Sequence, residues 1–343
     1  MANELIFNET TIPFHPHDTV AQALWRANVM VWSFSYSRNR PQGLFCGIGR
    51  CGSCLAQVEG SPRLLCMELA RPMLNVKPFP VGQRPGLSST DFPTAPPFVL
   101  CTDVLIVGGG WYGIMVASLL QAQKIDTIQV DERPWRQHTH SLWSTVVALW
   151  PGLDNVSAWS IAYRTAYLLS ARYVVLATGT VSVPDPAIGV QIPGVLTEDA
   201  LTMLYETKTD MPPGGVLLVR NRLQTAPWSY WMEQFHPERL VWHGDTDVVF
   251  EGSPHLDAIH VGHTTVHCTW IGVPGALRPS RELLEGFLEP NARVVNHDTW
   301  IRYENIFIVG RAASPNSPDD RLIHGIHDVV ATISSQIKEV KKQ

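Results

Sequence analysis

Half of the six cysteines of this 343-residue chain lie in one short loop. The stretch FCGIGRCGSCLAQ (residues 45–57) places three cysteines and three glycines within ten positions that begin at Cys46. Six cysteines are too few for a disulfide framework in a chain of this length, and their clustering indicates a metal site in a reducing compartment. This loop therefore limits what the N-terminal part can fold into more than any other feature of the sequence.

The spacing of the cysteines indicates which metal centre the loop binds. Cys46, Cys51 and Cys54 have the pattern C-x4-C-x2-C, and Cys66 follows after eleven residues, which is the spacing of plant-type [2Fe–2S] sites. The intervening glycines permit the positive-φ turns that point backbone N–H groups toward a cluster. A structural zinc site normally pairs two C-x2-C motifs, whereas this loop has one, and disulfides would be unusual in the cytosol. We therefore predict a [2Fe–2S] cluster on these four thiolates.

The residues around the loop predict a small domain and a linker. Residues 4–14 have two short apolar runs around Asn8-Glu9 and predict a hairpin, and residues 17–29 predict a helix. Strand, strand, helix and cysteine loop is the order of β-grasp ferredoxin-like domains. We assign this domain to residues 1–80, a proline-rich linker to 81–101, and a nucleotide-binding domain to 102–343.

The second domain opens with a glycine-rich turn. An apolar strand at 104–107 runs into Gly108-x-Gly110-x-x-Gly113, a helical pattern follows, and the next strand ends at Asp131. A strand before the glycines, a helix after them and an acid on the next strand are together typical of a Rossmann dinucleotide site. The diphosphate is expected at the helix N-terminus, and Asp131 near the ribose hydroxyls.

Two further segments favour a flavin over a nicotinamide. Residues 171–180 form an apolar strand that ends in Ala-Thr-Gly, and residues 303–333 read as strand, glycine turn, loop and helix. Both are typical of two-dinucleotide-domain flavoproteins. A second glycine fingerprint is missing, because Arg220, Asn221 and Arg222 follow the strand at 216–219. We predict an α/β fold in which a degenerate NAD-like subdomain is inserted at 183–299 and has no nicotinamide site.

With these motifs, the chain resembles the large-subunit module of heteromeric FAD-dependent amino-acid and amine oxidoreductases. That family includes sarcosine oxidase alpha, the hydrogen cyanide synthase and opine oxidase A and B subunits, and dye-linked proline or hydroxyproline dehydrogenases. The resemblance is carried by residues 18–54 and by the segments GGGWYG, VDERP, STVVALWPG, VVLATGT and IPGVLTEDALTML. It implies a fused iron–sulfur and FAD subunit of a hetero-oligomer. Such a subunit relays electrons from a D-amino-acid-oxidase-like FAD subunit, which oxidises the substrate, to a downstream acceptor.

One departure from the family bears on the cofactor. The family usually has Gly-Asp where this chain has Gly310-Arg311, and an arginine cannot accept the ribityl hydrogen bond of that acid, although it could pair with a phosphate. FAD is the first choice, and a plain adenine nucleotide or an emptied site is the alternative. The predicted nucleotide contacts are Gly108, Gly110, Trp111, Tyr112, Gly113, Asp131, Glu132, Arg133, Ala177, Thr178, Gly179, Gly310 and Arg311.

Composition and the remaining motifs exclude several classes of function. The net charge of −5 gives no reason to expect nucleic acid, and no apolar run is long enough to span a bilayer, so the expected location is the cytoplasm. His138 and His140 lack an identifiable third metal ligand, and no catalytic constellation is evident. Cys101 and Cys268 are expected to be buried apolar residues. The alternatives to an electron relay are a scaffold subunit with a vestigial nucleotide site and a stand-alone NAD(P)H-dependent reductase.

Overall fold

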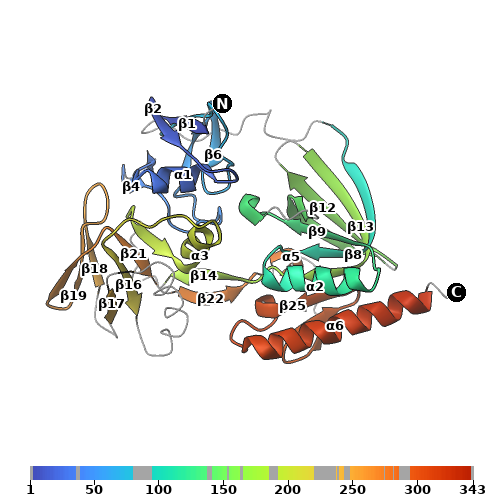
Figure 1. The fold of residues 1–343 in the computed structure, drawn as a ribbon. Coiled ribbons are helices and arrows are strands. Elements are labelled where there is room, and N and C mark those ends of the chain that lie inside the picture. Colours follow the sequence, from blue (N-terminus) through green and yellow to red (C-terminus); the bar gives the residue numbers. More distant parts are fainter. Residues whose placement is uncertain are drawn as a thin grey trace. The chain divides into compact units, whose positions relative to one another are not determined.

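The computed structural model divides the chain into two compact units. Unit 1 comprises residues 1–87 and 182–276, and unit 2 comprises residues 88–181 and 277–343 (Figure 1). Among the described residues, no helix is both long enough and apolar enough to cross a membrane. The structure describes residues 3–340 except 36–38, 80–94, 137–140, 153, 163–164, 185–191, 220–236, 238, 243–247, 274, 281 and 286–293.

The N-terminal part of unit 1 is built on a five-stranded sheet. Its strand order is β2-β1-β7-β5-β6, and the predicted hairpin of β1 and β2 is confirmed. The predicted helix is also confirmed as α1, which begins after the N-cap Thr19 with a capping box formed by Thr19 and Gln22. The elements are β1 (Glu4–Phe7), β2 (Thr10–Pro13), α1 (Val20–Arg26), β3 (Ser33–Phe34), β4 (Pro41–Gln42), β5 (Leu55–Val58), β6 (Ser61–Leu64) and β7 (Asn75–Lys77).

The second part of unit 1 is a small parallel sheet with one helix. The strand order is β15-β21-β16-β17, all parallel, and α3 follows β15 directly because Thr197 ends the strand and caps the helix. A three-stranded antiparallel sheet, β18-β19-β20, adjoins it in sequence. The elements are β15 (Val195–Thr197), α3 (Glu198–Glu206), β16 (Gly215–Val219), β17 (Arg239–Trp242), β18 (Val248–Glu251), β19 (Ala258–Val261), β20 (Thr264–His267) and β21 (Trp270–Val273).

Unit 2 is built on a nine-stranded sheet with helices on both faces. Its main path is β10-β9-β8-β13-β25-β24-β23, and β11 and β12 extend β13 as an antiparallel meander. The elements are β8 (Phe98–Val107), α2 (Trp111–Ala122), β9 (Thr127–Asp131), β10 (Ser141–Trp143), β11 (Thr145–Pro151), β12 (Val156–Ala162), β13 (Thr165–Leu176), α5 (Glu282–Glu285), β23 (Val294–Asn296), β24 (Trp300–Tyr303), β25 (Ile306–Val309) and α6 (Asp319–Val340).

The two faces of this sheet bury different cores. Val104 and Ile106 of β8 pack with α2 and α6, which lie side by side in Figure 1, whereas Leu105 and Val107 face a second core under the meander and α5. Successive strand residues point to opposite faces, so β8 serves both cores. The position of α6 therefore depends on its apolar stripe, which includes Ile326.

Three expectations differ from the structure in detail. Strand β8 begins at Phe98, so it starts inside the segment predicted as linker. Strand β23 pairs with β24 of unit 2, so the inserted part of unit 1 ends at residue 276 and not at 299. The prediction that Cys101 is buried is wrong, because this residue lies exposed on β8, whereas Cys268 is buried as predicted.

The chain crosses between the units in two paired strands. β14 (Thr180–Pro184) and β22 (Gly275–Pro279) form a two-stranded sheet, and the unit boundaries at 181/182 and 276/277 fall within them. Gly275 is required in this pair of strands, because a Cβ there would lie 2.7 Å from the backbone carbonyl oxygen of Val183.

The packing of α6 gives a first prediction. Replacing the buried Val329 by alanine should lower the free energy of unfolding by about 1.5–3 kcal/mol, because two methyl groups leave a filled core. The matched substitution Val340→Ala, at a position 51% exposed on the same helix, should change it by less than about 0.5 kcal/mol. Urea denaturation followed by circular dichroism measures both, and equal losses would contradict the assigned packing of α6.

Candidate functional site

The β5–β6 hairpin brings two of the four cysteines together. Leu55 pairs with Leu64 in this antiparallel ladder, and Leu65 N–H donates to the carbonyl of Cys54 at 3.0 Å. Leu65 therefore lies opposite Cys54, and the sulfur of Cys66, the next residue, lies 3.3 Å from the sulfur of Cys54. The remote fourth cysteine of the sequence pattern is thus placed by strand register.

The other two cysteines pair within the loop itself. Cys46 and Cys51 are hydrogen-bonded through their side chains. Gly49 N–H donates to Cys66 Sγ at 3.2 Å, and Ser53 N–H donates to Cys51 Sγ at 3.4 Å. The glycines of the loop, Gly47, Gly49 and Gly52, have φ of +67°, +75° and +72°. These left-handed turns, which glycine adopts without steric cost, direct N–H groups inward as predicted.

Hydrogen bonding sets which of the thiols ionise first. The Cys51 thiol and the backbone N–H groups of residues 48, 50 and 51 lower the pKa of Cys46 to about 6, although burial opposes this. The same pairing and burial raise the pKa of Cys51, and the contact with Cys54 together with burial raises the pKa of Cys66. Cys51 and Cys66 therefore keep their protons at neutral pH, and iron binding must release them.

The arrangement of two pairs fits a binuclear cluster. A [2Fe–2S] cluster takes four cysteine thiolates, two for each iron, and the loop presents the pairs Cys46·Cys51 and Cys54·Cys66. Within the described part of the chain, no three His, Cys, Asp or Glu side chains are arranged about a single metal ion. Cys46, Cys54 and Cys66 are buried and Cys51 is partly exposed.

In unit 2, the predicted glycine turn has the close contacts that require glycine. A Cβ on Gly113 would lie 1.9 Å from the carbonyl oxygen of Gly108, so only glycine lets α2 start against the strand. A Cβ on Gly108 would lie 2.3 Å from the carbonyl oxygen of Ala177, so the predicted Ala-Thr-Gly segment lies directly beside the turn. Gly110 is the N-cap of α2, has no side-chain cap, and is followed by no acid in the first turn. This helix start is suited to a diphosphate.

Asp131 and an arginine complete this end of the site. Asp131 is buried, and its carboxylate accepts hydrogen bonds from the N–H groups of Gly109 and Arg133. Arg136 Nη1 lies 4.0 Å from Asp131 Oδ2 and 3.1 Å from the position of a Cβ on Gly110. The arginine therefore adds positive charge at the helix start where the diphosphate is expected. Arg136 was not among the predicted residues, although its position two residues after the VDERP segment could have suggested it.

The other end of the predicted site is a network around Asp319. Asp319 Oδ1 accepts hydrogen bonds from the hydroxyl of Tyr112 at 2.6 Å and from Arg311 Nη2 at 2.9 Å. The Tyr112 ring lies against Gly310, where a Cβ would come within 2.6 Å of it. Burial and the hydrogen bond to Asp319 raise the pKa of Tyr112. Asp319 thus provides a carboxylate beside position 311, and it was not among the predicted residues.

The remaining predicted residues have less specific positions. Trp111 is 69% exposed at the start of α2, and the carbonyl of Glu132 accepts a hydrogen bond from the Trp143 indole. Thr178 Oγ1 donates to the carbonyl of Ser280, and within the described ranges no atom apart from those of its chain neighbours lies within 4 Å of the Cβ position of Gly179. His138, His140 and the segment from Arg220 to Arg222 lie outside the described residues. The described residues at the start of α2 fit the adenosine diphosphate part of a dinucleotide, and the flavin side has a changed set of polar groups.

The fold and these two sites define an N-terminal [2Fe–2S] domain combined with a Rossmann-like oxidoreductase fold. A family model described as a 2Fe-2S iron-sulfur cluster binding domain matches residues 4–77. No curated protein sequence matches the chain significantly. The predicted fold class, mixed α/β with both of these parts, is confirmed.

Solved structures resemble the chain at low sequence identity. The crystal structure of L-proline dehydrogenase from P. horikoshii is similar over 91% of this chain and 69% of that chain, with 15% identity and a TM-score of 0.65. A FAD-dependent pyridine nucleotide-disulphide oxidoreductase from Desulfovibrio vulgaris is similar over 61% of this chain and 62% of that chain, with 13% identity and a TM-score of 0.48. At these low identities only the fold can be inferred, and the inference rests on the L-proline dehydrogenase structure, which has the higher TM-score.

The cysteine loop gives the second prediction. The purified chain should contain about two iron and two acid-labile sulfide per chain, and Cys51→Ser should remove the visible absorption of the cluster because one iron loses a ligand. Cys51 is the most exposed of the four, so the fold should tolerate this change. The control Cys101→Ser, at an exposed cysteine outside the loop, should leave iron and sulfide unchanged. Zinc without labile sulfide in anaerobically prepared protein would refute the assignment.

Proposed function

We propose that this chain is the electron-transfer component of a multi-subunit FAD-dependent amino-acid or amine dehydrogenase or oxidase. The observation that carries the proposal is the combination, in one chain, of two cysteine pairs in a [2Fe–2S] domain and a glycine turn with a buried acid. When bound, FAD links two-electron to one-electron chemistry and the cluster supplies one-electron transfer. The likeness to an L-proline dehydrogenase structure agrees with this class of enzyme.

The chain's own residues have three tasks in this proposal. Cys46, Cys51, Cys54 and Cys66 hold the iron, and the backbone N–H groups of the loop offset the negative charge on their sulfurs. The helix start at Gly110, with Arg136 beside it, binds the diphosphate. Tyr112, Arg311 and Asp319 orient the other half of the dinucleotide.

Substrate oxidation is assigned to a partner. The resemblance to the large-subunit modules implies a D-amino-acid-oxidase-like FAD subunit in a hetero-oligomer, and a downstream acceptor that takes the electrons. The proposed site of action is the cytoplasm, as expected for a cysteine-based cluster in a reducing compartment.

A second candidate is an iron–sulfur subunit whose nucleotide site holds only an adenine nucleotide. The observation that favours it is the ion pair of Arg311 with Asp319 at 2.9 Å, which engages the changed residue on the flavin side. A reductase driven by NAD(P)H is disfavoured by the sequence alone, since arginine and asparagine replace the glycines of a second fingerprint at residues 220–222.

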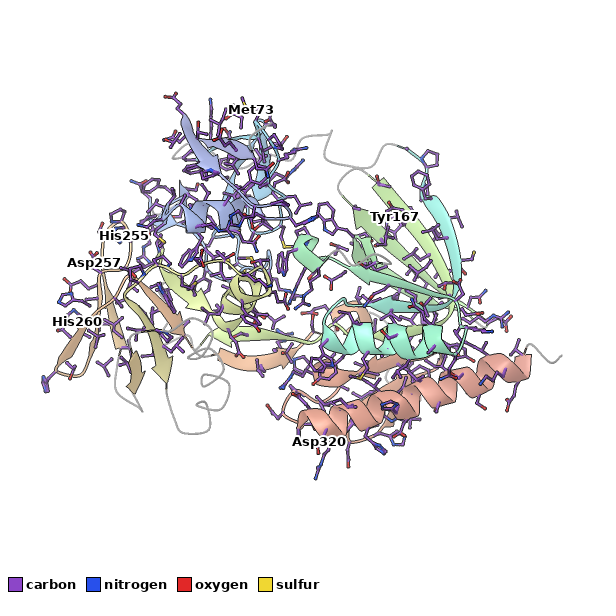
Figure 2. The ribbon with its side chains drawn as sticks, viewed as in Figure 1. Met73, Tyr167, His255, Asp257, His260 and Asp320 are labelled. Atoms are coloured by element: carbon purple, nitrogen blue, oxygen red, sulfur yellow. The ribbon has the colours of Figure 1, made fainter. Side chains whose placement is uncertain are left out.

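The nucleotide itself distinguishes the two candidates. We expect acid precipitation and chromatography to release FAD at about one per chain, held non-covalently. Asp319→Asn should reduce the retained FAD roughly tenfold, because a charge-assisted contact on the flavin side is lost. Its neighbour Asp320, labelled at the start of α6 in Figure 2, is the control, and Asp320→Asn should retain FAD. Release of AMP, ADP or ATP without flavin would establish the adenine-nucleotide candidate instead.

Electron transfer from a partner tests the proposal as a whole. The chain should co-purify with an amino-acid-oxidase-like flavoprotein encoded beside it, and adding that partner's amino acid or amine should bleach the cluster absorption anaerobically. In a complex built with Cys51→Ser, the amino acid should still reduce the partner but no electrons should reach an external dye. Rapid bleaching by NADH or NADPH in the isolated chain would instead establish the reductase.

A further inference from the structure

Helix α3 lies directly against the cysteine loop within unit 1. Thr197 N–H, at the N-cap of α3, donates to the carbonyl of Phe45 at 3.0 Å, one residue before Cys46. A Cβ on Gly47 would lie 2.9 Å from Ala200 Cα and 3.4 Å from Met203 Cβ. Ala200 and Met203 are three positions apart, so they present one face of the helix, and both are fully buried. The backbones of the loop and of α3 are therefore in direct contact.

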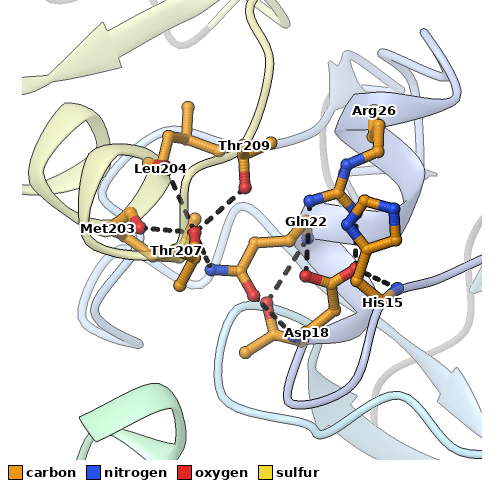
Figure 3. A network of polar contacts seen from close by, with 9 residues as sticks. His15, Asp18, Gln22, Arg26, Met203, Leu204, Thr207 and Thr209 are labelled. Carbon is orange, nitrogen blue, oxygen red and sulfur yellow. Dashed lines mark hydrogen bonds and ion pairs between the residues drawn. The ribbon is translucent and has the colours of Figure 1, made fainter. Parts of the chain in front are cut away.

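A second contact fixes the other end of the helix. Gln22 Nε2 donates to Oγ1 of Thr207, the C-cap of α3, at 2.8 Å, and Thr207 Oγ1 in turn donates to the Met203 carbonyl at 2.8 Å (Figure 3). Gln22 is fully buried, and its Oε1 accepts from Thr19 N–H in the capping box of α1. One amide side chain thus joins the capping interactions of two helices that lie 185 positions apart in sequence.

The other end of the cysteine loop is less covered within unit 1. Among the described residues, no atom apart from those of its chain neighbours lies within 4 Å of the Cβ position of Gly52, and Arg50 is exposed while Cys51 is partly exposed. Gly47 and Ile48, in contrast, are buried on the side of α3. Helix α3 therefore packs against the loop at Gly47 and not at Gly52. The two glycines nevertheless have similar backbone conformations, with φ of +67° and +72°.

We propose that α3 is a fixed cover of the cluster loop, and that shielding the cluster is the function of the inserted part of unit 1. The proposal rests on the proposed function in one respect, that the loop holds a [2Fe–2S] cluster. It assigns Gly47, Ala200 and Thr207 as positioning residues: their contacts keep α3 seated, and they touch no substrate.

The cover has a predictable effect on the electron site. Reduction adds one negative charge to the cluster, and water stabilises the more highly charged form. A helix that excludes water on the Gly47 side therefore lowers the reduction potential and protects the iron from chelators. Lifting the helix should raise the potential and speed the loss of iron.

The matched glycines of the loop provide the test. Gly47→Ala and Gly52→Ala place the same side chain in the same left-handed conformation, but only the first meets α3. In the full chain, Gly47→Ala should raise the reduction potential above that of Gly52→Ala and speed iron loss to a chelator about tenfold, the factor produced by ~1.4 kcal/mol. If both variants carry the cluster and have equal reduction potentials and equal rates of iron loss, the proposal that α3 shields the cluster is wrong.

A second pair of variants keeps the test decisive if Gly47→Ala does not fold. Thr207→Val removes the hydroxyl that binds Gln22 of α1, whereas Thr202→Val on the same helix removes a hydroxyl that donates to the carbonyl of Glu198 within α3 itself. Thr207→Val should shift potential and iron loss in the same direction as Gly47→Ala, and Thr202→Val should not. Cluster-loaded variants that behave alike would overturn the cover alone, whereas wild-type protein without labile sulfide would overturn the cluster assignment itself.

Discussion

Four cysteine sulfurs, three from one loop and one from the residues that follow β6, must lie close together, and three of them are buried. Buried anionic sulfur is costly unless N–H groups face it, and the loop obtains these groups by turning its backbone left-handed at glycine. A glycine-rich loop has few side chains that could cover the sulfur atoms. The Gly47 side is therefore closed by atoms from elsewhere in the chain, the backbone and Cβ atoms of α3.

Much of this was predictable from the sequence because it is local chemistry. Cysteine spacing reflects cluster geometry, and Gly108-x-Gly110-x-x-Gly113 reflects a turn in which a single Cβ would clash with a carbonyl. The contacts that could not be predicted join segments far apart in sequence. Asp319 reaches Tyr112 across 207 positions through a helix start that reads as ordinary solvated surface, and no local pattern distinguishes it from Asp320. Likewise, the exposure of Cys101 depends on which face of β8 the meander covers.

The two ends of the proposed nucleotide site have the same arrangement of charges. At each end an arginine is already paired with a carboxylate, Arg136 with Asp131 at 4.0 Å and Arg311 with Asp319 at 2.9 Å. A diphosphate bound at the start of α2 would share Arg136 with the carboxylate of Asp131. Its binding free energy must therefore come largely from the uncapped N–H groups at the start of α2, which have no competing acid in the first turn.

The same property of a helix start explains why a nucleotide fold can persist without a second fingerprint. In a parallel α/β sheet, the N–H groups at the end of a strand and the start of its helix are where a phosphate binds. At the β15–α3 junction, the N–H of Thr197 instead donates to the Phe45 carbonyl. This junction follows β15, whereas the missing glycines would follow β16 at residues 220–222, so their replacement leaves this contact unchanged. The contact still requires that α3 has a fixed position relative to the cysteine loop. The buried, paired strands β15 and β21 provide this, because α3 follows β15 directly.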